Sequence, residues 1–325
     1  MLYYMENNEN KFLICNKIYS KNKILGGIWG LIIGDAVGVP YEFYEASELP
    51  VLEEIDMISP KGFEKSYSNV PFGTYSDDSA QFLCVLDSYI ESRGFNIDNL
   101  ANKLYRWLHN GLWAVDKIVF DVGDQTASAL TEYEMGVSPL KSGFVIQEGK
   151  GNGSLMRVLG IPLLHIGTDE ELVEFSHKQS VITHGHICNQ VCCAFYSLVA
   201  KNLLLDKSFE VAYNNAILTL KNIYKHKDEY LYELENNILP DDILIESGTG
   251  YVVDCLKSSF KVISESNTYE EVIKKSIALG NDTDTTAAVA GGLAGIIYGY
   301  NGIPEKWYKK IRGKENIIKL LDKIK

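Results

Sequence analysis

Positive charge is scarce in this sequence. Its 325 residues include 31 Lys and Arg against 43 Asp and Glu, which gives a formal net charge of -12 at pH 7. A nucleic-acid backbone or an anionic membrane would require a basic face on the protein. The charge balance therefore argues against nucleic acid and against a membrane as the main partner.

Long apolar runs and a secretion signal are also missing. The longest apolar run, residues 287–300, is rich in Gly and Ala and is shorter than the roughly 20 residues that a membrane span requires. The first residues, MLYYMENNENKF, lack the basic start and apolar stretch that are typical of a signal peptide. We expect a cytoplasmic protein.

No Pro-, Gly- or Ser-rich linker, internal repeat or low-complexity tract divides the chain. With 46% hydrophobic residues, it is large enough to bury a sizeable core. We assign residues 1–22 to an N-terminal extension and residues 23–325 to a single domain. The alternative is a domain boundary in the polar stretch KHKDEYLYELENNILPDD, residues 225–242.

The six cysteines include no paired Cys-x-x-Cys motif. Cys188, Cys192 and Cys193 cluster on one helical stretch. The four-residue spacing of the first two puts them on one face, near His184 and His186. A zinc site is one interpretation. We favour buried, reduced thiols, because free Cys is usually a core residue.

Alternating strand patterns are scarce, whereas apolar residues recur at helical spacing. Such stripes occupy residues 77–90, 97–108, 189–205 and 209–223. A further helix opens with Thr268 and Glu271 at capping-box spacing and closes at Gly280. Pro304 stands where a proline in the first turn of a helix belongs. We predict an all-α fold with long loops that carry the Gly and Asp motifs.

Two acidic motifs stand immediately before apolar helical patterns. They are FGTYSDDSAQF (residues 72–82), with Ser76, Asp77 and Asp78, and GNDTDTTAAVAGGLAG (residues 280–295), with Asp282, Asp284 and Thr285. One Ser, Thr or Asp would suffice to cap a helix. The additional carboxylates repel one another unless a cation lies among them.

The two motifs together offer a hard, all-oxygen ligand set, which suits Mg²⁺ or Mn²⁺ and does not suit zinc or copper. If the two helix starts converge, the set is large enough for two ions about 3.5 to 4 Å apart, as in dinuclear hydrolytic sites. The small residues of AAVAGGLAG would let neighbouring helices approach closely. The motif would then lie at the centre of a helical bundle.

Several short motifs follow one another between about residues 24 and 310. They are GGIWGLIIGDAVGVPYEF, GTYSDDSAQ, FDVGDQTASAL, GKGNGSLMRVLGIPLL, SVITHGHICN, GTGYVVDCLKSSF, LGNDTDTTAAVAGGLAGIIYG and IPEKW. Any one of them is a weak signal. In this order they resemble the ADP-ribosylglycohydrolases, also called ADP-ribosylhydrolases of the dinitrogenase-reductase-activating type.

The resemblance implies a compact, orthogonal, all-α bundle with a central dinuclear metal site and two Mg²⁺ (or Mn²⁺) ions as cofactors. It implies hydrolysis at C1 of the distal ribose of an ADP-ribosyl group. The residues that match the family's metal ligands are Ser76, Asp77, Asp78, Asp282, Asp284 and Thr285. Asp77 also counts among the implied catalytic residues. Serine replaces the commoner threonine at position 76, which keeps the hydroxyl group.

Two further acids have candidate catalytic roles by the same resemblance. Glu42 matches a glutamate near the metals and the scissile bond, although from the residues alone it would be a surface carboxylate after a Gly/Pro turn. Asp35, in the same motif, is interpreted as structural. Asp121 lies where arginine-specific relatives carry an acid, and a carboxylate there could pair with a guanidinium group. The alternative for Asp121 is a helix N-cap, for which Asp124 is better placed.

The glycine-rich stretch GKGNGSLMRV is typical of a loop that approaches a ligand closely and precedes a helix whose N–H groups bind phosphate. By resemblance, the residues that hold the ADP-ribose diphosphate and ribose are Gly151, Asn152, Gly153 and Ser154. His184 would contact the nucleotide, or would be a satisfied histidine at a helix start. Tyr251 would stack on the adenine, or would be a core tyrosine.

The function that we expect is metal-dependent hydrolysis of ADP-ribosyl-arginine on a protein, with release of ADP-ribose. It would serve regulation or immunity against a toxin. The alternatives are an ADP-ribosyl-serine or O-acetyl-ADP-ribose hydrolase, and a non-catalytic ADP-ribose-binding protein, as in a lens crystallin. A metal-dependent phosphohydrolase lacks its usual signature, because the sequence contains no His-Asp pair.

Overall fold

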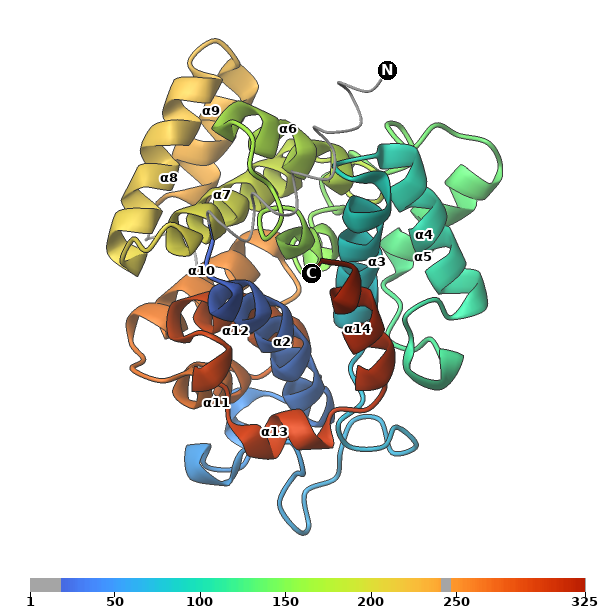
Figure 1. The fold of residues 1–325 in the computed structure, drawn as a ribbon, viewed down its shortest axis with the longest axis vertical. Helices are drawn as coiled ribbons and strands as arrows, with labels where there is room; N and C mark the ends of the chain where they lie inside the picture. The colour runs from blue at the N-terminus through green and yellow to red at the C-terminus, as the bar shows by residue number, and fades with distance from the viewer. Residues whose placement is uncertain (1–18, 241–246, 325) are drawn as a thin grey trace.

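The computed structural model describes residues 19–240 and 247–324, which form an assembly of α-helices (Figure 1). Within these ranges the extended pairings are three isolated β-bridges. The predicted all-α fold is therefore confirmed. Of the predicted N-terminal extension, residues 1–18 lie outside the described part of the chain.

The helical elements follow the expected apolar stripes. The α-helices are α2 (Lys21–Gly38), α3 (Asp77–Ser92), α4 (Ile97–Asn110), α5 (Asp124–Glu134), α6 (Asp169–Ser180), α7 (Ile187–Leu204), α8 (Phe209–Tyr224), α9 (Asp228–Glu233), α10 (Val252–Ser264), α11 (Tyr269–Ala278), α12 (Thr283–Tyr298), α13 (Glu305–Lys310) and α14 (Lys314–Leu321). The four predicted stripes correspond to α3, α4, α7 and α8. Their boundaries agree with the stripes to within a few residues.

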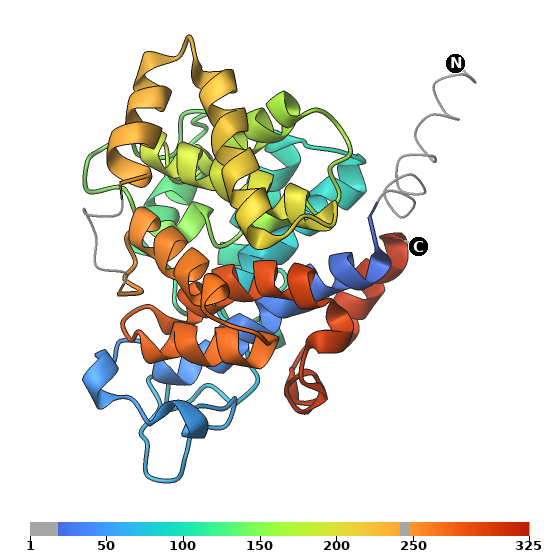
Figure 2. The same ribbon diagram turned by 90° about the vertical axis from the view of Figure 1, so that its left-hand side faces the viewer.

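Helices α2 and α12 form the centre of the molecule. Residues 26–38 of α2 and residues 283–296 of α12 are all buried. A helix that is apolar on every face is typical of a protein core. Figures 1 and 2 show the two helices side by side, with the other helices around them.

Glycines line the contact between α2 and α12. On α2 they recur at positions 26, 30, 34 and 38, and this spacing places them on one helix face. A Cβ atom on Gly30 would lie 2.3 Å from the carbonyl oxygen of Gly291, and one on Gly38 would lie 2.4 Å from Cα of Asp284. The two backbones are thus in direct contact, as the small residues of α12 predicted.

Two stretches of the described chain are long and apolar enough to cross a membrane, residues Lys21–Tyr41 and Ile187–Leu204. Of their most apolar windows, 94% and 83% is buried inside the protein. Core helices have the same length and composition. These two stretches are therefore weak evidence for a membrane span.

Two helix starts differ from the sequence prediction in detail. Thr268 caps α11 by accepting a hydrogen bond from the N–H of Glu271 (3.1 Å). The Glu271 carboxylate, however, accepts from the N–H of Asn267 (2.9 Å), one residue before the cap. Pro304 is the N-cap residue of α13 and so precedes its first turn.

The cysteines that the structure describes are buried, unpaired thiols: Cys84, Cys188, Cys192, Cys193 and Cys255. The prediction of reduced core cysteines is confirmed for these five. Within residues 19–240 and 247–324, the one cluster of His, Cys, Asp and Glu with the spacing of metal ligands contains no cysteine. The zinc alternative has no support there.

We predict that Gly30→Ala destabilises the protein by about 3 kcal/mol, because the added methyl group would overlap with the Gly291 carbonyl and push α2 away from α12. Gly123→Ala is the control. Gly123 is exposed with φ -62, and a Cβ there would meet its nearest atom at 3.9 Å. Urea unfolding of both variants measures the difference. Equal stability of Gly30→Ala and Gly123→Ala would contradict the direct backbone contact.

Candidate functional site

The first acidic motif forms the start of α3. Ser76 is its N-cap residue, and the serine oxygen accepts a hydrogen bond from the N–H of Asp78 (3.4 Å). The backbone N–H groups of Ser76 and Ser79 donate to the Asp35 carboxylate on α2, at 2.8 and 2.9 Å. Asp35 is fully buried. It therefore fixes the first turn of α3 against α2, which is the structural role that the sequence indicated.

A chain of buried hydrogen bonds orients Asp77. The side-chain amide nitrogen of Gln81 donates to Asp77 Oδ2 (2.8 Å). The Arg157 guanidinium donates to the side-chain oxygen of Gln81, Oε1 (2.8 Å). Arg157 is fully buried and also binds Gln179 and Thr183. Burial lowers the pKa of Arg157 to about 10, so the group remains charged at neutral pH. Its positive charge partly balances the nearby acids.

The second acidic motif forms the start of α12. Asp282 occupies the N-cap position, but its side chain makes no capping bond. Its Oδ2 accepts instead from the amide of Asn152 (2.8 Å). Asp284 Oδ1 accepts from the N–H of Thr285 (2.9 Å), and the Thr285 hydroxyl donates to Asp78 Oδ2 (3.3 Å). The starts of α3 and α12 therefore converge, as a metal site shared by the two acidic motifs requires.

Glu42 is held beside this junction by a backbone pairing. The N–H of Phe43 donates to the carbonyl of Asn281, and the N–H of Asn281 donates to the carbonyl of Tyr44, both at 2.7 Å. Phe43 and Asn281 have positive φ angles of 67° and 60°. Glu42 itself is 4% exposed. The interpretation of Glu42 as a surface carboxylate is therefore wrong, because the pairing turns its side chain inward.

Carboxylate oxygens of Glu42, Asp121 and Asp284 lie within 4.8 Å of one another. The three residues come from segments far apart in the sequence. Asp121 has a positive φ of 57° and is partly exposed. It lies three residues before α5, whose N-cap is Gly123. Asp121 thus belongs to the acid cluster and is not the cap of α5.

Tyr67 completes the cluster and was missed by the sequence analysis. Its hydroxyl lies close to the carboxyl groups of Glu42 and Asp121, and its single proton can be donated to one of them at a time. Its ring lies against Phe43 and Phe120, with centroids 6.0 and 5.1 Å apart. No motif surrounds Tyr67 in the sequence. The loop that carries Tyr67 folds back over the residues before Glu42, and this places Tyr67 in the cluster.

Burial and mutual repulsion raise the pKa values of four buried carboxyl groups at this site, those of Glu42, Asp77, Asp78 and Asp284. For Glu42, loss of solvation is the largest cause, and the charges of Asp121 and Asp282 add to it. Together they raise the pKa of Glu42 to about 11. Burial first, and neighbouring acids second, raise the pKa values of Asp77, Asp78 and Asp284 well above the usual range. Without a cation, the cluster therefore favours protonated carboxyl groups.

Four buried carboxylate oxygens in this cluster have no hydrogen-bond partner: Glu42 Oε2, Asp78 Oδ1, Asp282 Oδ1 and Asp284 Oδ2. Each unpartnered buried acceptor costs on the order of 1–3 kcal/mol. Cations placed among them would satisfy these oxygens and offset the repulsion. Carboxylate and hydroxyl oxygens are the ligands that Mg²⁺ and Mn²⁺ prefer. The residues present therefore fit these ions.

The glycine-rich loop lies against the second acidic motif. The N–H of Asn152 donates to the Gly250 carbonyl (3.0 Å), and the N–H of Asp282 donates to the Gly248 carbonyl (3.0 Å). The helix expected after the loop is a short 3-10 turn, Asn152–Ser154. The Asn152 side chain extends from this turn toward Asp282. The Ser154 hydroxyl is buried and accepts from Ser180 (2.9 Å).

His184 lies behind the glycine-rich loop. It is 3% exposed, and burial lowers its pKa to about 3, so the ring is neutral. The Thr183 hydroxyl accepts from Arg157 (2.7 Å) and shares a hydrogen bond with His184 Nδ1 (2.8 Å), whose direction depends on the tautomer of the ring. A Cβ on Gly151 would lie 3.5 Å from Nε2. The ring thus supports the loop, and a contact with a nucleotide stays a prediction.

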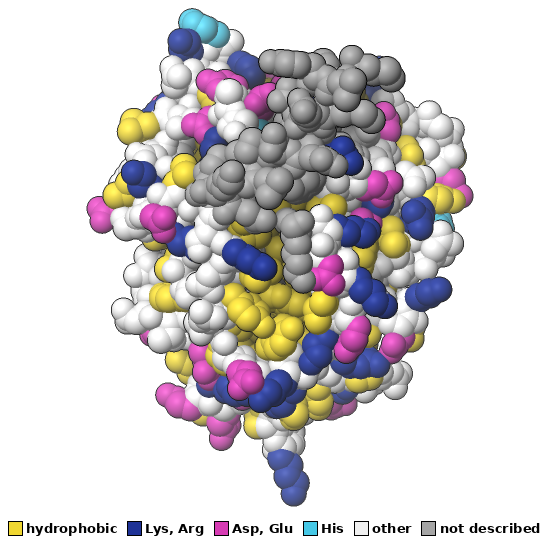
Figure 3. All heavy atoms as spheres, viewed as in Figure 1, with side chains coloured by type: hydrophobic (Ala, Val, Ile, Leu, Met, Phe, Trp, Pro, Cys, Tyr) yellow, Lys and Arg dark blue, Asp and Glu magenta, His cyan; other side chains and the backbone are white. Residues whose placement is uncertain are grey.

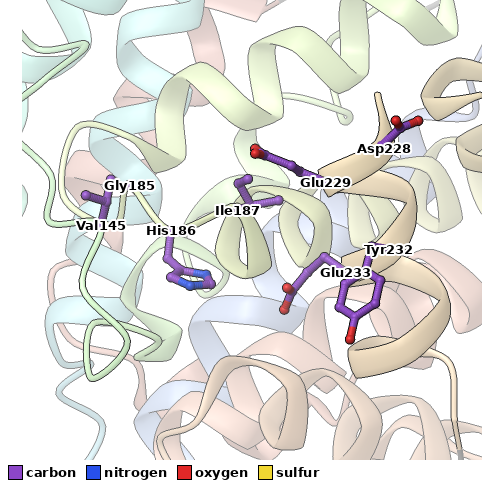
Figure 4. A pocket seen from close by; sticks show the side chains of 8 residues that line it. All are labelled: Val145, Gly185, His186, Ile187, Asp228, Glu229, Tyr232 and Glu233. Atoms are coloured by element: carbon purple, nitrogen blue, oxygen red, sulfur yellow. The ribbon is translucent and has the colours of Figure 1, made fainter. Parts of the chain in front are cut away.

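One hollow borders this loop, and a second lies near the start of α7. One, of about 390 Å³, is lined by Gln147, Glu148, Lys150, Gly151, Gly250 and Tyr251. Tyr251 is half-buried and pairs with Gly151 through a backbone bridge. A larger hollow, of about 680 Å³, lies between the start of α7 and α9. Figure 4 shows His186 on one wall of it and Glu233 and Tyr232 on the other. The smaller hollow leaves room for a flat ligand group beside the loop.

The fold and the site define an all-α protein whose centre is a carboxylate cluster beside a glycine-rich loop. The sequence profile of the ADP-ribosylglycohydrolase family matches residues 17–325, and the chain therefore belongs to this family. The resemblance of the motifs is confirmed. The family assignment supports a glycosidic-bond hydrolase.

Individual relatives agree with this assignment. The chain is 28% identical over 308 residues to ADP-ribosylarginine hydrolase Tri1 of Serratia proteamaculans (strain 568). The aligned residues cover 94% of this chain and 79% of the relative. It is 22% identical to ADP-ribosyl-[dinitrogen reductase] glycohydrolase of Rhodospirillum rubrum, over 89% of this chain and 90% of the relative. A solved ADP-ribosylglycohydrolase-related protein complex has the same fold, with a TM-score of 0.71, 24% identity, and coverage of 93% of this chain and 96% of that chain.

Asp284→Asn is expected to stabilise the metal-free protein relative to the parent, by an amount that grows as the pH rises from about 4 to 7. The raised pKa of Asp284 means that the folded parent retains a proton that the unfolded chain has released. Parent stability therefore falls with rising pH, and the neutral amide avoids this loss. The gain at pH 7 should be on the order of 1–3 kcal/mol.

Urea unfolding in chelator at several pH values measures this difference. Glu210→Gln, at an exposed acid on α8, is the control and should show no pH-dependent gain. A constant difference between Asp284→Asn and the parent across this range would contradict the raised pKa.

Proposed function

We propose that this protein hydrolyses the N-glycosidic bond between ADP-ribose and an arginine side chain of a modified protein. The observation that carries the proposal is the approach of Glu42, Asp121 and Asp284 to within 4.8 Å of one another, next to the glycine-rich loop. Relatives named ADP-ribosylarginine hydrolase, from Serratia proteamaculans and Pseudomonas putida, support the arginine linkage.

Two Mg²⁺ or Mn²⁺ ions are the proposed cofactors. The residues that would hold them are Ser76, Asp77, Asp78, Asp282, Asp284 and Thr285. When bound, the ions supply Lewis-acid stabilisation and a template for the ribose hydroxyl groups and a water molecule. The unpartnered oxygens of Asp78, Asp282 and Asp284 support this assignment.

Asp121 is the proposed partner of the leaving guanidine. An arginine linked to ribose presents a planar, positively charged group, which a carboxylate binds through charge-assisted hydrogen bonds. Asp121 is partly exposed, whereas the other acids of the cluster are buried, so it faces an incoming protein substrate. Tyr67 lies beside this carboxylate and can donate its hydroxyl proton to it.

Glu42 is the proposed proton acceptor for the attacking water. Departure of the guanidine leaves positive charge on the ribose ring at C1, and water must be deprotonated as it adds. Glu42 Oε2 has no hydrogen-bond partner within the described protein. With cations bound among the neighbouring acids, Glu42 would be ionised, and this oxygen would then accept the proton. The Tyr67 hydroxyl lies beside the same carboxyl group.

The proposed nucleotide site lies on the other side of the acid cluster. The backbone of residues 151–154 would bind the diphosphate, with His184 supporting the loop from behind. Asn152 links this loop to Asp282 through its amide. Tyr251 borders a hollow of about 390 Å³ and would stack on the adenine. Residues from both acidic motifs and the loop are thus in contact with one another.

Release of ADP-ribose from an arginine-ADP-ribosylated protein is expected with Mg²⁺ and is expected to be lost in chelator and in Asp284→Ala. A serine-ADP-ribosylated peptide is assayed in parallel and should not be cleaved. Thermal unfolding gives a readout that does not depend on activity: Mg²⁺ should raise the Tm of the parent more than that of Asp284→Ala. Release from the serine peptide alone would overturn the arginine assignment.

Asp121→Asn should lower kcat/KM for the arginine substrate by about 100-fold, because the amide keeps the shape but loses the charge that binds the guanidinium group. Binding of free ADP-ribose, measured by calorimetry, should change less than about 3-fold, since Asp121 does not face the diphosphate. Asp124→Asn is the matched control, because Asp124 is an exposed acid in the first turn of α5. Equal loss in both variants would contradict the role of Asp121.

A further inference from the structure

A cleft with a basic lining lies between α14 and the loop that joins α4 to α5. Its volume is about 850 Å³, and its basic side chains are Arg106, Lys117, Lys319 and Lys323. We call it the basic cleft. Figure 3 shows basic side chains gathering on the face where Figure 1 places α14, with some acidic ones among them. In a chain with a net charge of -12, this is a local concentration of positive charge.

The cations of the basic cleft are available to a ligand. Within the described residues, Arg106, Lys117 and Lys319 are exposed and form no ion pair, and Lys323 has only a 3.9 Å contact with Asp87. Two acids also line the cleft, Asp116 and Glu315. Asp116 is already neutralised by Arg312, at 2.6 Å. Positive charge therefore exceeds negative charge in the cleft.

The loop that forms one wall is held in a strained conformation. Trp113, Asp116 and Lys117 have positive φ angles of 65°, 54° and 61°. The Tyr75 hydroxyl donates to the Trp113 carbonyl (2.6 Å), and the Trp113 indole donates to Asp87 (3.3 Å). Three such residues in one loop require support from the surrounding fold, and such strain concentrates at functional sites. The surrounding fold therefore maintains the shape of this wall of the cleft.

The same loop leads directly to the acid cluster. Four peptide units separate Lys117 from Asp121, so their Cα atoms are at most about 15 Å apart. Ile118, between them, is 65% exposed, and Phe43, next to Glu42, is 69% exposed. The surface next to the acid cluster therefore carries the apolar side chains of Phe43 and Ile118, and the basic side chains of the cleft lie farther from the cluster. A polypeptide that carries a modified residue fits this order, whereas a single nucleotide would not span it.

We propose that the basic cleft docks an acidic segment of the ADP-ribosylated protein while its modified residue occupies the acid cluster. This inference rests on the proposed function and names the class of protein substrate. An extended peptide advances about 3.3 Å per residue, so acidic residues about four or five positions from the modified residue would reach the cleft. Their carboxylates would pair with Arg106, Lys117 and Lys319.

The test compares the parent with Lys117→Glu/Lys319→Glu. The substrates are ADP-ribosylated peptides with acidic or neutral residues four and five positions from the modified arginine, together with free ADP-ribosyl-arginine. Lys207→Glu/Lys225→Glu is the control, because it makes the same charge change at exposed lysines beside α8, away from the cleft. All three proteins are assayed at low and at physiological salt.

We expect the parent to cleave the acidic peptide with about 5- to 20-fold higher kcat/KM than the neutral one at low salt, and less at physiological salt. The cleft variant should lose this preference through KM and retain parent activity on free ADP-ribosyl-arginine. No preference in the parent, or an equal preference in the cleft variant, would overturn the proposal.

A binding measurement separates this proposal from the catalytic one. A fluorescent acidic peptide without ADP-ribose should bind the parent and the control variant, and bind the cleft variant at least about 5-fold more weakly. If no ADP-ribosyl substrate is cleaved but this difference is found, the proposed function fails and the docking surface stands. Equal binding to all three proteins would overturn the docking surface.

Discussion

The close contact between α2 and α12 determines where the acidic side chains lie. Gly38, at the end of α2, has room for no Cβ because Asp284 of α12 lies against it. The same stretch of α2 carries Asp35, which fixes the start of α3, and leads within four residues to Glu42. One backbone contact thus brings together side chains from three segments. A larger residue in this contact would separate the segments that form the site.

Burial of the acid cluster has an unfavourable free energy and so lowers the stability of the folded protein. Buried carboxylates lose solvation and repel one another, which is why their pKa values are raised. The surrounding apolar helices and the bonds of Asp35 and Arg157 hold the acids in place despite this cost. Stability and function are therefore in conflict at this site, as is common where charged groups are buried for chemistry. A divalent cation would resolve the conflict locally.

The distribution of charge has a consequence for protein substrates. An acidic centre attracts a guanidinium group but repels acidic residues around it. A basic region one short loop away from Asp121 compensates this repulsion for one particular geometry of approach. Phe43, next to Glu42, and Ile118, between Lys117 and Asp121, are both exposed. Under the proposed function, selectivity for the carrier protein would be separate from recognition of ADP-ribose.

Local signals in the sequence determined the all-α fold, the positions of α3, α4, α7 and α8, and the two acidic motifs, because helical periodicity and capping depend on near neighbours. Only the tertiary structure decided the burial of Glu42, the participation of Tyr67, the 3-10 turn at Asn152–Ser154 and the basic cleft. Each of these depends on contacts between segments far apart in the chain. The pairing of Phe43 with Asn281 shows the reason: nothing near either residue encodes the other.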